Sequence, residues 1–122
     1  MQEIKSFIQR DPRYAIPPAV EARVEFNYPN PTGRRLSLQL LDLSVSGLSF
    51  VADHELPLVV RGAKMEGTII RVGDSEIEGK LLIKHFTRGD AYEVMYGAIL
   101  FPESAQDQQK LNDIISMLAS MG

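Results

Sequence analysis

The stretch that decides the fold runs from residue 42 to residue 50 and reads Asp42-Leu43-Ser44-Val45-Ser46-Gly47-Leu48-Ser49-Phe50. It interrupts an apolar run with a carboxylate, hydroxyls and a glycine before strand-like residues resume. Aspartate and serine favour turns because their side chains bond nearby backbone groups, and glycine adopts backbone angles that other residues avoid. Such a cluster would weaken a buried strand, so the stretch predicts a sharp turn that displays polar groups beside a barrel wall.

Strand-like segments flank this turn on both sides. Six of them show apolar–polar alternation or a β-branched and aromatic composition: residues 20–28, 36–40, 48–52, 65–72, 76–86 and 92–101. Turn-forming residues such as Gly73 and Asp74 separate them, and short strands at regular spacing are typical of a small sandwich or barrel. We therefore predict an all-β domain built on a six-stranded antiparallel barrel.

The C-terminal part of the chain changes its period. Its apolar residues fall at helical spacing: Leu111, Ile114, Ile115, Leu118 and Met121. Ser104 with Asp107 three residues later resembles a capping box, which predicts a helix over 104–121. The apolar stripe must pack on something. The open end of the barrel is the favoured surface, and a second subunit is the alternative.

The N-terminal part divides into a short apolar segment and a loop. Ile4, Phe7 and Ile8 are spaced as one face of a short helix, either a terminal turn or the end of a linker. The following stretch, residues 10–18, holds three prolines that exclude regular helix, together with two arginines. We expect residues 1–14 to form a flexible segment and residues 15–122 to form the barrel domain with its helix.

The composition restricts the possible partners. The chain has 122 residues, a formal net charge of -3 and no cysteine. That length suits one domain, and an acidic balance favours a small anionic ligand over DNA or RNA, whose binding usually needs a basic face. There is no apolar run of membrane-spanning length and no signal-peptide pattern, so we expect a cytoplasmic protein without membrane insertion.

The sequence holds no catalytic or metal-binding constellation. His54 and His85 are the only histidines, and neither has metal-ligand spacing to another histidine. His85 lies within a strand-like run and is expected to be partly exposed. No nucleophile elbow, P-loop or dinucleotide fingerprint is present. We therefore expect a protein that is not an enzyme and carries neither a catalytic residue nor a metal site.

The motif Asp42-x-Ser44-x-x-Gly47 resembles the second signature of the PilZ family, whose members are typically receptors for cyclic di-GMP. Their first signature, Arg-x-x-x-Arg, precedes the first strand. Arg13 aligns with its second arginine, whereas the first position holds Gln9, with Arg10 one place late. The resemblance covers residues 9 to 121 and implies a PilZ-like barrel with a C-terminal helix.

The resemblance also implies a ligand, cyclic di-GMP, and no other cofactor. The ligand-binding residues it implies are Arg10, Arg13, Asp42, Ser44 and Gly47, with Gln9 and Ser46 beside them. Arginine suits this ligand because its planar fork meets phosphate oxygens or guanine O6 and N7, and a carboxylate accepts from the guanine N1 and N2 donors. The loop would wrap over the ligand and pass the signal to a protein effector.

A second hypothesis belongs to a different class. Glutamine cannot neutralise a phosphate, so Gln9 favours a degenerate PilZ-like adaptor that binds no nucleotide. Such a protein would act through protein contacts, for instance in pilus or flagellar motility machinery. For Asp42, Ser44 and Gly47 the structural alternative is a self-bonded turn. The oligomeric state expected under either hypothesis is a monomer or a weak dimer.

Overall fold

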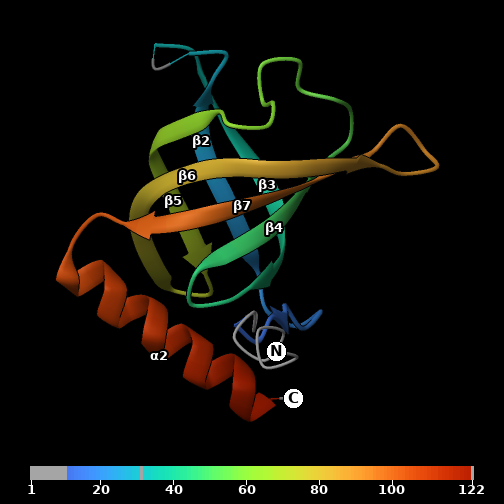
Figure 1. Ribbon diagram of the computed structural model, residues 1–122. Helices are drawn as coiled ribbons and strands as arrows, with labels where there is room; N and C mark the ends of the chain where they lie inside the picture. Colours follow the sequence, from blue (N-terminus) through green and yellow to red (C-terminus); the bar gives the residue numbers. More distant parts are fainter. Residues whose placement is uncertain (1–10, 31, 122) are drawn as a thin grey trace, which may run out of the picture.

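The computed structural model describes residues 11–30 and 32–121. Among them are seven strands and one helix in this order: β1 (Tyr14–Ala15), β2 (Ala22–Tyr28), β3 (Arg34–Leu43), β4 (Gly47–Ala52), β5 (Lys64–Val72), β6 (Ser75–Arg88), β7 (Val94–Pro102) and α2 (Ala105–Met121). Figure 1 shows the strands wound around a common centre with α2 below them. The expectation for residues 1–9 lies outside the described residues, as do Gln9 and Arg10.

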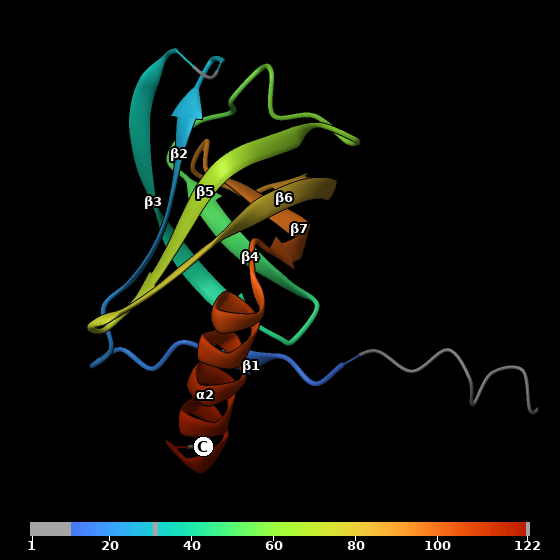
Figure 2. The same cartoon turned by 90° about the vertical axis from the view of Figure 1, so that its left-hand side faces the viewer.

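The strands close into an antiparallel barrel. Neighbouring strands follow the order β3-β2-β5-β6-β7-β4, and a further pairing of β4 with β3 closes the ring. Strand β1 pairs antiparallel with the C-terminal end of β3, where Tyr14 pairs with Leu43 and Ala15 with Asp42. Figure 2 shows β1 at the end of the barrel that faces α2. The predicted all-β fold, a six-stranded antiparallel barrel with a C-terminal helix, is confirmed.

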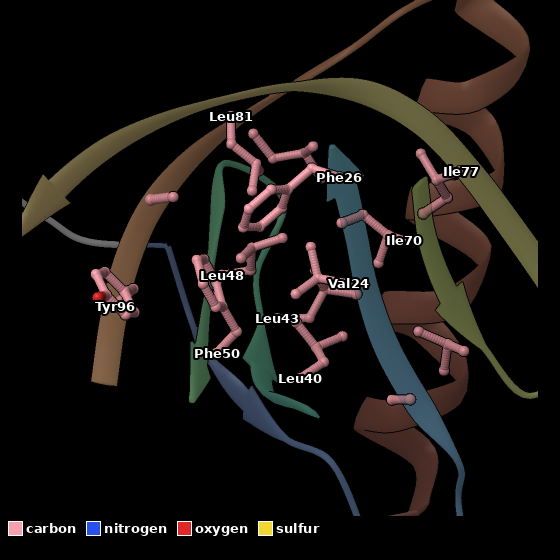
Figure 3. Packing of buried hydrophobic residues seen from close by; sticks show 14 of the residues in the cluster. Val24, Phe26, Leu40, Leu43, Leu48, Phe50, Ile70, Ile77, Leu81 and Tyr96 are labelled. Carbon is pink, nitrogen blue, oxygen red and sulfur yellow. The ribbon is translucent and has the colours of Figure 1, made fainter. Parts of the chain in front are cut away.

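Aromatic side chains are part of the core, and Figure 3 shows Phe26, Phe50 and Tyr96 among the buried aliphatic residues. The rings of Phe50 and Tyr96 stack with centroids 5.2 Å apart, and Phe26 meets Phe50 edge-on at 5.9 Å. The hydroxyl of Tyr96 accepts a bond from the backbone N–H of Leu56 at 2.8 Å, which satisfies its polar end. Burial raises the pKa of Tyr96 above its usual value of 10.0. A rigid core of this kind fixes where outward-facing side chains lie.

Helix α2 packs on one end of the barrel. Its buried face carries Leu111, Ile114 and Leu118, which join the core cluster, so the barrel end covers this part of the predicted stripe, whereas Met121 is 50% exposed. At the helix start the Ser104 hydroxyl accepts from the Asp107 N–H at 3.1 Å and donates to the Asp107 carboxylate. Asp107 also accepts from the Glu78 N–H at 3.0 Å, and these bonds lower its pKa. Ser104 therefore caps the helix as predicted, but the Asp107 carboxylate bonds to the Ser104 hydroxyl and the Glu78 N–H rather than to the Ser104 N–H that a full capping box uses.

Several element boundaries differ from those expected. Strand β3 continues past Leu40 to Leu43, because a bulge between Leu40 and Asp42 inserts one residue and lets both leucines point inward. Asp42 therefore belongs to a strand, and the turn is confined to residues 44–46. The last strand begins at Val94, since Tyr92 has a φ of 68° and lies 88% exposed in the preceding loop.

No helix in the described part of the chain could cross a bilayer.

Candidate ligand-binding site

One line of cross-strand neighbours runs over the outer wall of the barrel. Asp42 on β3 pairs with Ser49 on β4, Ser49 with Gly97 on β7, and Gly97 with His85 on β6. We call these four residues the outer row. Ser49 lies between the buried residues Leu48 and Phe50, so alternation turns its side chain outward. His85 is exposed as well, at a register shift in β6 where its neighbour Lys84 is also exposed.

Arg13 joins the N-terminal segment to this row. Its Nη1 donates to Asp42 Oδ1 at 3.1 Å and to Ser49 Oγ at 2.8 Å. The pairing of β1 with β3 holds Arg13 beside the outer row. The bond from the Ile16 N–H to the Leu41 carbonyl at 3.0 Å continues this backbone pairing. The side chains of Arg13 and Asp42 stay 41% and 26% exposed, so the pair remains accessible to an incoming ligand.

Ser44 does not face the outer row. It is 2% exposed, and its hydroxyl accepts from the backbone N–H of Gly47 at 3.0 Å and of Ser46 at 3.3 Å. The Ser44 N–H in turn donates to the Gly47 carbonyl at 2.8 Å. These bonds close the turn between β3 and β4, which is the self-bonded arrangement weighed as the structural alternative for this motif.

Gly47 serves the packing of β4 against β7. A Cβ at this position would lie 2.5 Å from the carbonyl oxygen of Ala98, closer than real atoms approach. The neighbouring Ser46 carbonyl accepts from the Leu100 N–H at 2.9 Å, which ties the turn to the same strand. Glycine is therefore required here by a close backbone approach. The side chain of Ser46 lies exposed at the tip of the turn, beside Val45.

A hollow lies farther along β3 and β4, and none of the outer-row residues lines it. It has a volume of about 470 Å³ and is lined in part by Arg23, Gln39 and Val51. Gln39 pairs with Val51 on β3 and β4, and the pairing of Leu40 with Phe50 and the bulge separate this pair from that of Asp42 with Ser49. Arg23 donates from Nε to Ser37 Oγ at 3.0 Å, so a second guanidinium lies at the far side of the hollow.

The structure thus brings together part of the predicted set. Arg13 and Asp42 meet directly, whereas Ser44 and Gly47 build the turn beside them. Ser49 was not among the predicted site residues, because its pairing with Asp42 depends on the bulge in β3, which the alternation pattern does not show. His85 is exposed on its strand, as predicted. Its place in the outer row depends on strand register, which the sequence pattern does not show.

Residues that could hold a metal do not gather in the described ranges. Across residues 11–30 and 32–121 there is no group of three or more histidine, aspartate or glutamate side chains with suitable geometry. His54 contacts the neighbouring Asp53 through Nδ1 at 2.6 Å, and both side chains are largely exposed. The chemistry that the outer face offers is recognition of an anionic, hydrogen-bonding ligand by arginine, carboxylate and hydroxyl groups.

Comparison with solved structures identifies the class of fold. The PilZ domain of YcgR from Escherichia coli, solved with c-di-GMP, superposes with a TM-score of 0.75 over 93% of both chains, at 14% identity. The K. pneumonia MrkH–c-di-GMP complex gives a TM-score of 0.80 at 17% identity, over 91% of this chain and 51% of MrkH. The Bacillus subtilis inhibitor of motility MotI/DgrA gives 0.62 at 17% identity, over 85% of this chain and 48% of that one.

The chain therefore has the PilZ-domain fold, and the predicted resemblance is confirmed at the level of the fold. It spans about half the length of the MrkH chains it matches. No protein-family model and no curated protein sequence matches it. Because sequence identity to these structures is low, function must be argued from this chain's own residues.

Proposed function

We propose that this protein binds cyclic di-GMP on the outer wall of the barrel and acts as a signalling receptor or adaptor rather than an enzyme. The observation that carries this proposal is the contact of Arg13 with Asp42 and Ser49. It joins the arginine loop to the strand end that precedes the turn, on a barrel whose fold is shared with structures solved with c-di-GMP.

Each group has a distinct task in this proposal. The Arg13 fork binds a phosphate or a guanine edge, and Asp42 accepts from guanine N1 and N2. The exposed Ser46 hydroxyl contacts the ligand at the turn tip, while Ser44 and Gly47 hold the backbone of that turn in place. Arg10 and Gln9 complete the set from the segment that lies outside the described residues.

The bond between Arg13 and Asp42 does not oppose ligand binding strongly. Both side chains are partly exposed, and ion pairs at such positions contribute about 0–1 kcal/mol. A charge-assisted bond from a guanidinium to phosphate contributes about 1.5–3 kcal/mol. The ligand can therefore share Arg13 with Asp42 or take it over at little cost.

The direct test is isothermal titration calorimetry with cyclic di-GMP. We expect the unchanged protein to bind with a Kd of about 1 μM or tighter, which corresponds to about 8 kcal/mol. Arg13→Ala should abolish measurable binding. Arg34→Ala, which removes an exposed arginine at the opposite end of β3 from Asp42, is the matched control and should bind normally. Equal binding by all three proteins would refute the assignment of Arg13.

The proposal includes a change in residues 1–14 when the ligand binds. Ligand phosphates would pull the arginine loop onto the barrel and so create a new surface for a protein effector. Arg13 and Tyr14 already contact the barrel, so the added protection should fall mainly on residues before them. Hydrogen exchange measured with and without saturating ligand tests this, and unchanged exchange in residues 1–14 would contradict the wrapping step.

A second candidate is a protein-binding adaptor that takes no nucleotide. The exposed methionines of α2, Met117 and Met121, favour it, since exposed apolar side chains are enriched at interaction surfaces. In that case the titration would give no heat and no saturation for any variant. The next experiment would then be a search for a protein partner, for instance in motility machinery.

A further inference from the structure

His85 occupies an unusual position at the end of the outer row. A Cβ built on Gly97 would lie 2.4 Å from Cε1 and 2.5 Å from Nε2 of the His85 ring. The imidazole therefore lies directly over the backbone of β7, in the space that any other residue at position 97 would fill. This contact covers Gly97, which is buried, while His85 itself remains exposed to solvent.

The ring reaches toward the groups that Arg13 contacts. Gly97 pairs with Ser49 across β7 and β4, and adjacent strands lie about 4.8 Å apart. An imidazole over Gly97 is thus about one strand spacing from Ser49, whose hydroxyl accepts from Arg13 Nη1. Arg13 and His85 approach the same outward patch from opposite sides. An anion bound on this patch would lie between a guanidinium and an imidazole.

Elements packed against β6 bring charged groups near the imidazole. The loop before β5 carries Arg61, next to Gly62, whose N–H donates to the Ile83 carbonyl at 2.8 Å, and β5 carries Lys64, which pairs with Leu82. On its own strand, Lys84 is the preceding residue and is exposed. Strand β7 contributes uncharged neighbours on either side of Gly97, and β4 contributes the uncharged Ser49. From β3 comes Asp42, whose carboxylate accepts from Arg13.

We propose that His85 is a ligand-contacting residue of this face, and that its protonated imidazole donates a hydrogen bond to a phosphate of cyclic di-GMP. The inference rests on the proposed function. It gives the site a second cationic group on the barrel wall, whereas Gln9 supplies none. A histidine ordinarily titrates near pH 6.5, so protonation turns a neutral contact into a charged one.

The sign of the pH dependence follows from the ligand's charge. An anion favours the protonated form of an imidazole that it contacts, so the affinity for cyclic di-GMP is expected to be higher in mild acid than at alkaline pH. We expect the Kd of the unchanged protein to rise about tenfold between about pH 5.5 and about pH 8.0, since the charged hydrogen bond is lost.

The experiment is calorimetry with cyclic di-GMP at these two pH values on the unchanged protein, His85→Gln and His54→Gln. His85→Gln keeps a hydrogen-bonding side chain without the titration, so its Kd should vary less than about twofold. His54→Gln removes the other histidine, which lies in the loop after β4 beside Asp53, and should keep the full pH dependence. Thermal unfolding of each variant checks that it is folded.

The outcomes separate this inference from the proposed function. Binding of unchanged strength at both pH values, or a pH dependence that survives in His85→Gln, would overturn the role of His85 and leave cyclic di-GMP as the ligand. Loss of the pH dependence in His54→Gln would show that His54 causes it, and would also overturn the role of His85. Absence of binding by the unchanged protein at both pH values would overturn the proposed function and the inference together.

Discussion

The segment Asp42–Phe50 contains two pairs of residues with opposite orientations. Ser44 and Gly47, the turn pair, are buried, and they bond to one another or pack against β7. Asp42 and Ser49, the face pair, point outward and meet Arg13. A short polar segment thus combines residues that build a turn with residues that face outward and contact Arg13. The two pairs should respond differently to substitution, in stability for the turn pair and in binding for the face pair.

The largest effect is expected from Gly47→Ala. The added Cβ would overlap the Ala98 carbonyl oxygen, and since that atom is backbone, β4 and β7 must separate. We expect the free energy of unfolding, measured by urea denaturation, to fall by about 3 kcal/mol. Ser46→Ala is the matched control, and its effect on stability should stay within about 0.5 kcal/mol. A stable Gly47→Ala protein would show that the turn pair is not structural.

Asp42→Ala should act on binding instead. We expect the affinity for cyclic di-GMP to fall about thirtyfold, or about 2 kcal/mol, because the acceptor for guanine donors is lost. The free energy of unfolding should change by less than about 1 kcal/mol, since the pair with Arg13 is exposed. Asp90→Ala in the loop between β6 and β7 is the control. Tighter binding by Asp42→Ala would mean that Asp42 only competes with the ligand for Arg13.

Ser44→Ala tests the turn pair by its hydrogen bonds. The substitution leaves the buried N–H of Gly47 and the partly buried N–H of Ser46 without their hydroxyl acceptor. We expect the free energy of unfolding to fall by about 1.5 kcal/mol. Calorimetry should show a smaller loss of affinity than for Asp42→Ala, because the face pair remains. If instead Ser44→Ala abolished binding without a loss of stability, its hydroxyl would have to contact the ligand directly.

The sequence predicts the buried parts of the structure better than the outward-facing site. The period of the apolar residues fixed the strand pattern and the α2 stripe, because burial alone dictates that spacing. The outer row could not be predicted, since Ser49, Gly97 and His85 come together only through strand register and the bulge in β3. Likewise, a motif match does not tell that Ser44 points inward and Asp42 outward.

A second serine in the chain makes the same bond in an exposed setting. The hydroxyl of Ser104 accepts from the Asp107 N–H at 3.1 Å, as that of Ser44 accepts from Gly47 at 3.0 Å. Because water can replace the lost acceptor at the helix start, Ser104→Ala should cost only about 1 kcal/mol in urea denaturation, less than Ser44→Ala. An equal cost for both would mean that burial of the turn pair does not set its contribution.

The pH dependence of Ser104→Ala provides a further check. Bonds from the Glu78 N–H and from Ser104 hold the pKa of Asp107 below its ordinary value of 3.8, and the substitution should raise it. A carboxyl whose pKa is lowered in the folded state stabilises the protein at pH values above its ordinary pKa. This contribution to the free energy of unfolding is lost as the pH falls through the folded-state pKa. The difference between the unchanged protein and Ser104→Ala should therefore be full at neutral pH and narrow in acid. For Ser44→Ala no such narrowing is expected, since its hydroxyl bonds backbone groups that do not titrate.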